Sequence, residues 1–157
     1  MDKLLRLLYE NARLTDTQLA AMLGCTVTEV RAQIASFEKN GAIRAYKAVV
    51  DWDKTDRQNV TAIIELKVTP RRDVGFESIA EQVMAFEEVE SVYLMSGGYD
   101  LSVRVNGRSF QDIAAFVAKR LSTLDSVIST STHFVLRRYK DNNVMFLGEN
   151  QDERGIM

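Results

Sequence analysis

Thr15-Asp16-Thr17-Gln18 is followed closely by Thr26-Val27-Thr28-Glu29, and Gly24 lies between the two quartets. In each quartet a threonine stands three positions before a glutamine or glutamate, which is the capping-box pattern that starts a helix. Glycine is the residue type that most readily ends a helix. The stretch therefore predicts two helices joined by a tight turn, which is the layout of a helix-turn-helix.

Residues on both sides of this motif complete a small N-terminal domain. Leucines at helical spacing predict a first helix over about residues 2–11, and one apolar face predicts a long third helix over residues 27–40. The apolar stretches 43–46 and 48–50 predict a small β ribbon, the wing of a winged helix-turn-helix. The polar segment 51–59 is interpreted as a linker.

The rest of the chain contains an internal repeat. The octets Phe76–Val83 and Phe110–Val117 match at four apolar positions, and each has the spacing of an amphipathic helix. Alternating strand patterns precede both octets, and a strand that begins with Ser-Val follows each of them. The order β-α-β-β-α-β predicts an α+β fold in which a ferredoxin-like domain follows the winged helix-turn-helix.

Both predicted helices must cover one face of the sheet, so the other face needs a different cover. Apolar side chains such as Ile63 and Tyr93 belong to that face, and we expect at least a dimer formed through residues 51–139. Residues 140–157 are predicted to form a mostly polar C-terminal tail. Its apolar quartet 144–147 packs either on the domain or on a partner.

Composition narrows the possible functions. The 157 residues are 46% hydrophobic and 27% charged, which is typical of a globular protein. No apolar run approaches the roughly 18 residues of a membrane helix. A lone cysteine, Cys25, and a lone histidine, His133, leave little material for a disulfide, a metal site or a catalytic triad. We therefore expect a cytoplasmic protein that is not an enzyme and has no cofactor and no metal.

Charge is distributed unevenly along the chain. Residues 1–50 carry seven basic and five acidic side chains, whereas residues 51–157 carry 13 basic and 17 acidic ones. A mildly basic N-terminal third permits a nucleic-acid partner but does not require one, because dedicated binders are usually more basic.

The outward face of the third helix is the candidate DNA-reading surface, because the second helix of such a motif enters the major groove. Arg31 is the side chain there that can read guanine with two hydrogen bonds. The helix N-terminus can hold a phosphate, and basic residues beyond the helix can contact the DNA backbone. The predicted DNA contacts are Thr26, Thr28, Arg31, Ala32, Lys39, Arg44 and Lys47. The alternative is a helical domain whose charges only solvate it.

Two further segments are candidate ligand contacts. In Met95-Ser96-Gly97-Gly98-Tyr99-Asp100-Leu101 the glycines are most often simple turn residues. The same stretch could hold a carboxylate with its backbone N–H groups and an ammonium with Asp100, and an amino acid has both groups. The hydroxyls of Ser129-Thr130-Ser131-Thr132 could donate to a ligand or could simply reflect strand propensity.

The runs Leu14–Ala20 and Phe37–Tyr46 resemble the DNA-binding module of the Lrp/AsnC (feast/famine) transcription regulators. Ser96–Asp100 and Val127–Leu136 resemble the effector-binding domain of the same family. The resemblance covers about residues 2–139. It implies a DNA-binding domain over 1–50, a linker over 51–59 and an effector-binding and oligomerisation domain over 60–139.

The resemblance also implies a mechanism. Members form dimers that place their sheets back to back and often assemble further, to octamers. Amino acids bind in clefts between dimers and alter assembly or DNA binding. Carried over to this chain, the effector site falls on Met95, Ser96, Gly97, Gly98, Tyr99, Asp100 and Leu101, and on Ser129, Thr130 and Ser131.

Two other functions remain open from the sequence. Family members often carry several arginines on the recognition helix, whereas Arg31 stands nearly alone here. The chain could therefore be an amino-acid sensor or interaction protein that has lost specific DNA binding. The third possibility is an enzyme, because siroheme decarboxylases are built from the same pair of modules. The lone histidine argues against it.

Overall fold

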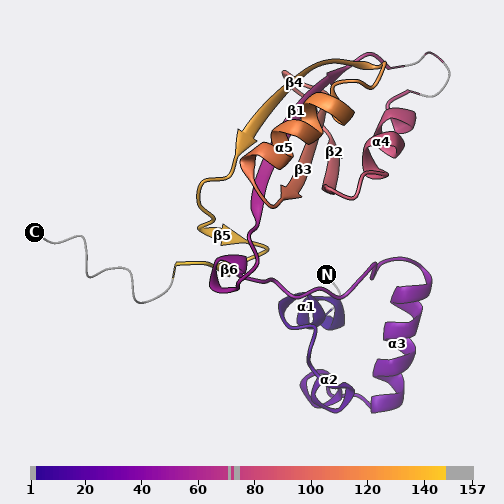
Figure 1. Ribbon diagram of the computed structural model, residues 1–157. Coiled ribbons are helices and arrows are strands. Elements are labelled where there is room, and N and C mark those ends of the chain that lie inside the picture. The colour runs from indigo at the N-terminus through magenta and orange to yellow at the C-terminus, as the bar shows by residue number, and fades with distance from the viewer. Residues whose placement is uncertain (1–2, 71, 73–74, 148–157) are drawn as a thin grey trace, which may run out of the picture. The chain divides into compact units, whose positions relative to one another are not determined.

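The computed structural model describes residues 3–70, 72 and 75–147 (Figure 1). The chain divides into two compact units, Met1–Val49 and Val50–Met157, and each has its own apolar core. Residues 148–157, the end of the predicted tail, lie outside the described part. Among the described residues, no helix combines the length and the apolar character needed to span a bilayer.

The N-terminal unit consists of three helices, α1 (Lys3–Glu10), α2 (Asp16–Leu23) and α3 (Val27–Lys39). Both predicted capping boxes are formed, with Thr15 at the start of α2 and Thr26 at the start of α3. Gly24 ends α2 in the left-handed conformation at φ 70°, which a residue with a side chain rarely adopts. The predicted helix-turn-helix is therefore confirmed. The centre of the core is formed by Leu4, Leu8, Leu19, Ala20 and Val30.

The predicted β ribbon over residues 43–50 is wrong, because these residues form no strand. An isolated two-stranded ribbon is only marginally stable, and this one lacks an Asn-Gly type of turn between its halves. The chain instead folds back on the end of α3. Gly41 turns it at φ 76°, the Ile43 N–H donates to the Phe37 carbonyl at 3.0 Å, and the Tyr46 hydroxyl donates to Glu38 at 2.9 Å.

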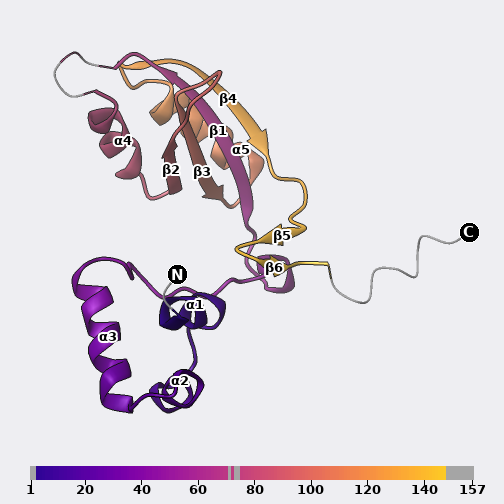
Figure 2. The same ribbon diagram turned by 180° about the vertical axis from the view of Figure 1, so that it is seen from behind.

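The C-terminal unit has the predicted ferredoxin-like arrangement. Its elements are η1 (Trp52–Lys54), β1 (Val60–Val68), α4 (Glu77–Met84), β2 (Val89–Leu94), β3 (Leu101–Gly107), α5 (Phe110–Phe116), η2 (Val117–Leu121) and β4 (Val127–Phe134). The strands form an antiparallel sheet in the order β2-β3-β1-β4. Helices α4 and α5 lie on one face of the sheet (Figure 1). The opposite face, on which none of the described helices lies, is turned toward the viewer in Figure 2. Alternate residues of β1, from Ala62 to Val68, are buried under the helices.

The residues beyond β4 include a short hairpin. Strands β5 (Lys140–Asp141) and β6 (Val144–Met145) flank Asn142 and Asn143, whose positive φ values of 45° and 63° suit a tight hairpin turn. Asp141 lies 3.2 Å from Arg104 on β3, so this part of the predicted tail packs on the domain. Within the quartet 144–147, Phe146 lies 3.8 Å beneath the Arg138 guanidinium, whereas the other three side chains are exposed.

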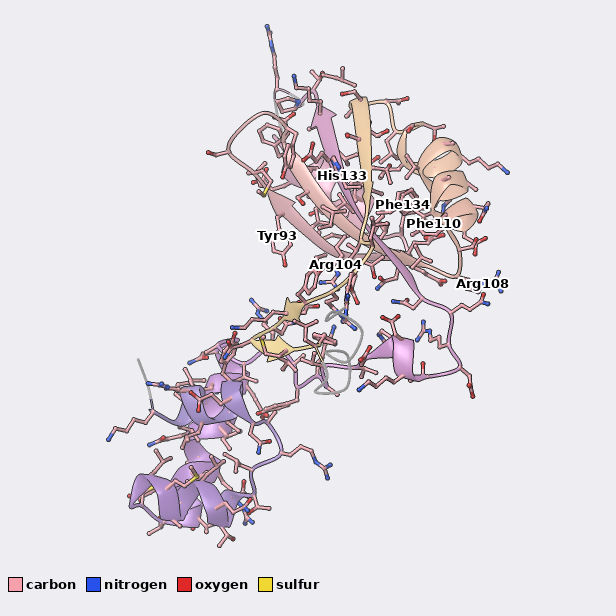
Figure 3. The ribbon with its side chains drawn as sticks, turned by 90° about the vertical axis from the view of Figure 1, so that its left-hand side faces the viewer. Tyr93, Arg104, Arg108, Phe110, His133 and Phe134 are labelled. Atoms are coloured by element: carbon pink, nitrogen blue, oxygen red, sulfur yellow. The ribbon has the colours of Figure 1, made fainter. Side chains whose placement is uncertain are left out.

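The open face of the sheet carries fewer apolar side chains than expected. Ile63 and Tyr93 are exposed on it, at 41% and 60%. Tyr93 and Arg104 lie on the side of the sheet away from the ring pair of Phe110, on α5, and Phe134, on β4 (Figure 3). The sheet register places polar residues around them: Thr61, Glu65, Lys67, Ser102, Arg104, Asn106, Ser129, Ser131 and His133.

Candidate DNA-binding and effector sites

The exposed face of α3 carries three of the predicted DNA contacts. Val30 is fully buried, so the side chains of Thr28, Arg31 and Ala32 are turned away from the core and are exposed. Two of the three are too small to reach far. Of these three side chains, Arg31 is the one that is both long and polar.

Arg31 has a partner that the sequence did not reveal. Its Nε donates to Asp16 Oδ2 at 2.7 Å, and the Arg31 side chain is still 70% exposed. Asp16 is the first residue of α2, where a carboxylate is also stabilised by the helix dipole. The sequence pattern marks Asp16 only as part of a helix start, because a contact between neighbouring helices depends on how they pack.

The N-terminus of α3 is already occupied by side chains of the chain itself. Glu29 Oε2 accepts hydrogen bonds from the Thr26 backbone N–H and from the Thr26 hydroxyl, both at 2.8 Å. Both bonds hold the pKa of the Glu29 carboxyl below its usual value of 4.5, and the bond from the backbone N–H has the larger effect. A phosphate at this terminus would have to approach an ionised carboxylate.

The remaining predicted DNA contacts lie beyond the middle of α3. Lys39, Arg44 and Lys47 are all exposed. The Arg44 guanidinium lies against Gly41, where an added Cβ would come within 3.3 Å of Cζ. Glycine at position 41 therefore lets this charge lie close to the end of α3.

The connection between β2 and β3 is tied to the central strand by Asp100. The Asp100 N–H donates to the Leu66 carbonyl at 2.9 Å, and its Oδ2 accepts the Val68 N–H at 2.9 Å. The connection is closed by the Met95 N–H, which donates to the Asp100 carbonyl at 2.8 Å. One carboxylate oxygen of Asp100 thus acts as a brace, and the other makes no hydrogen bond to the described residues.

The glycines of this connection leave open space. Gly97 has φ 151°, and a Cβ added to Gly97 or Gly98 would meet nothing within 4 Å. Ser96 is exposed and Tyr99 is half-buried. The segment thus presents backbone with little cover from its own chain.

The two predicted effector segments lie at the same end of the sheet but are not neighbours. The register pairs Leu101 with Leu66, and Leu66 with Thr130, so one row of residues crosses both segments. Strand β1 separates them, which corresponds to about 10 Å across two strand spacings. Ser129 and Ser131 belong to the open face, whereas Thr130 belongs to the face of the helices.

Two hollows of the C-terminal unit lie at the other end of the sheet. One is lined by residues 57–59, 87–90 and 106–108, and the other by Glu88, Phe116 and neighbours at the end of β3. The segment 95–101 lines neither of them.

Each of the two units matches a known protein family. The family described as the Lrp/AsnC ligand binding domain matches residues 61–145, and a winged helix-turn-helix DNA-binding family matches residues 3–44. The HTH-type transcriptional regulator YugG of Bacillus subtilis, itself uncharacterised, is 49% identical over 99% of this chain and 94% of its own length. A proline dehydrogenase transcriptional activator of Rhodobacter capsulatus is 28% identical, over 88% of this chain and 91% of its own.

The fold has solved counterparts. A transcriptional regulator of Neisseria meningitidis, crystallised as an L-Met complex, superposes with a TM-score of 0.75 at 23% identity, over 90% of this chain and 93% of the other. The families and relatives are transcription regulators, which confirms the expectation of a regulator rather than an enzyme. The chain belongs to the Lrp/AsnC family of transcriptional regulators, with a helix-turn-helix DNA-binding unit followed by the family's ligand-binding domain.

Proposed function

We propose that this regulator binds double-stranded DNA in the cytoplasm as a homodimer or larger assembly, and that an amino acid alters its assembly or its DNA binding. The carrying observation is the row of residues that joins Leu101, Leu66 and Thr130 at one end of the sheet. It aligns the two predicted effector segments, of which residues 95–98, Ser129 and Ser131 are exposed in a single chain whereas Leu101 is buried.

An assembly through the open sheet face fits this arrangement. The exposed Ile63 and Tyr93 lie among polar side chains, and a mixture of apolar and polar groups is ordinary at the interface between two proteins. A second copy on this face would cover Ser129 and Ser131 and leave the end of the sheet for further copies. The effector would then bind where copies meet, because one chain supplies only an open surface there.

An amino acid fits the groups that are present. Backbone N–H groups near Gly97 and Gly98 can bind a carboxylate, and the free oxygen of Asp100 can pair with an ammonium. The names of two relatives also mention amino acids, which supports this choice of effector. One solved relative is described as an L-Met complex, and a relative in Haemophilus influenzae is named leucine-responsive regulatory protein.

The test is a thermal-shift screen of the twenty common amino acids, combined with light scattering. A ligand at 100 times its dissociation constant stabilises the folded state by about 2.7 kcal/mol. We expect one amino acid or a small group of them to raise the melting temperature and to change the scattering mass. A chain that stays monomeric at micromolar concentration and responds to none of them contradicts the proposal.

A second candidate function is an amino-acid sensor that no longer binds specific DNA. The observation in its favour is the Arg31–Asp16 ion pair, which partly neutralises the main base-reading side chain. A gel shift on the DNA upstream of the regulator's own coding sequence, at low and moderate salt, separates the two functions. Retarded bands that survive competition by unrelated DNA favour the regulator.

A further inference from the structure

The ion pair between Arg31 and Asp16 leaves one part of the guanidinium unused. Only Nε is engaged, at 2.7 Å from Asp16 Oδ2, and the terminal nitrogens Nη1 and Nη2 make no hydrogen bond to the described residues. A guanidinium is planar and carries five N–H donors in fixed directions. Because Nε is held, the plane is oriented while the two terminal nitrogens stay available.

Those two terminal nitrogens are the donors needed to read guanine. Guanine presents O6 and N7 in the major groove, and a bidentate contact from arginine discriminates against other bases by about five- to 150-fold. An exposed arginine with no partner would lose its rotational freedom on binding. Immobilising such a side chain costs about two- to twelvefold in affinity, and this cost is avoided if the side chain is already held.

We propose that Asp16 is a positioning residue for DNA recognition, which holds the Arg31 guanidinium in the orientation that reads a guanine. The inference rests on the proposed function, in which α3 contacts DNA. It assigns a task to the first helix of the motif, whose Asp16 reaches across to α3. The sequence of the DNA is read by Arg31, and Asp16 acts through it.

The charge of Asp16 adds a second effect of opposite sign. A carboxylate near the DNA backbone disfavours binding to any sequence, because phosphates repel it. On DNA with the correct guanine, this repulsion is offset by the oriented contact of Arg31. On other DNA it is not offset, so Asp16 increases the ratio between specific and non-specific affinity.

The experiment uses the full chain and an operator selected by the wild-type protein from a random DNA pool. Dissociation constants are measured on this operator and on copies in which each G·C pair is replaced singly. The variants are Arg31→Ala, Asp16→Asn and the double variant. The matched control is Glu10→Gln, because Glu10 pairs with Arg6 Nε at 3.0 Å on α1 and carries the same charge.

We expect Arg31→Ala to abolish discrimination at one G·C pair, a loss of about five- to 150-fold. Asp16→Asn should lower discrimination at that same pair by about two- to twelvefold and leave the other pairs unchanged. In the Arg31→Ala background it should have no further effect on discrimination, although loss of the carboxylate should still tighten binding to all copies alike. Partial unfolding would lower affinity equally at every pair, so the position of the effect separates positioning from a merely structural role.

Three results would overturn the inference. If Arg31→Ala loses discrimination but Asp16→Asn keeps it, Asp16 has no positioning role and the proposed function stands. If Asp16→Asn tightens binding to the operator more than to the copies changed at the Arg31-dependent pair, and more than Glu10→Gln does, the ion pair is a mask rather than a support. If Arg31→Ala loses no discrimination at any pair, α3 does not read DNA through Arg31, and base reading by this side chain fails together with the inference.

Discussion

Replacing Asp100 tests whether its carboxylate braces the sheet, binds the effector, or does both. In Asp100→Ala the Val68 N–H loses its acceptor. Val68 is only 4% exposed, so water cannot replace that bond easily. An unsatisfied buried donor costs about 1–3 kcal/mol. For a unit of roughly 100 residues this corresponds to a fall in melting temperature of about 4–12 °C.

The isosteric variant Asp100→Asn separates the two roles. Its amide oxygen can still accept the Val68 N–H, so we expect a melting temperature close to that of the wild type. The variant carries no charge, however, and therefore cannot pair with an ammonium. If Asp100 contacts an amino-acid effector, Asp100→Asn should reduce the effector-induced thermal shift while leaving the free protein stable.

Both quantities come from one assay, thermal melting with and without the effector. Asp125→Ala is the control, because it removes an exposed carboxylate from the loop before β4. A melting temperature of Asp100→Ala equal to that of Asp125→Ala refutes the brace. A full effector shift in Asp100→Asn refutes the ammonium contact and leaves the carboxylate as a structural feature only.

Three further predictions concern other sites. Gly98→Val should melt normally, because a Cβ there meets nothing within 4 Å, yet its effector-induced thermal shift should fall, since the branched side chain fills the space above the backbone. Lys39→Ala should lower the salt slope of DNA binding by about one unit on any sequence, measured by titration at several salt concentrations. Because the pKa of Glu29 is lowered in the folded state, its ionised carboxylate should stabilise the N-terminal unit fully at pH values above the unfolded pKa near 4.5. This stabilisation should be lost as the pH falls through the lower pKa of the folded state. Glu29→Gln keeps the cap but should remove that acid dependence. The measurement is the unfolding of both proteins by circular dichroism at several pH values between 2 and 6.

The elements that sequence alone predicts are those that depend on near neighbours. The boxes at Thr15 and Thr26 join residues three positions apart, so composition and spacing suffice to place them. The two amphipathic octets and the alternation of β1 are likewise local signals. They predict the helix-turn-helix and the order of helices and strands along the chain.

The features that were missed depend on contacts between distant segments. Arg31 meets Asp16 only because α2 packs on α3, and Asp100 meets Val68 only because β3 and β1 are neighbours. A local signal was available for the hairpin, since two asparagines are favoured where both turn residues need positive φ. The β ribbon predicted over residues 43–50 is wrong because its apolar pattern favours a strand, whereas a strand also needs a partner and these residues have none within the described chain.

The order of strands in the sheet also bears on how the chain folds during synthesis. The N-terminal unit is built from local contacts, which favours rapid folding as soon as residues 3–49 have emerged. Central strand β1 has to wait, because its partners β3 and β4 begin only at Leu101 and Val127. Its apolar row from Ala62 to Val68 remains uncovered in the nascent chain for that interval. During synthesis the nascent chain therefore carries a folded N-terminal unit joined to a strand whose apolar row has no strand partners until most of the chain has been made.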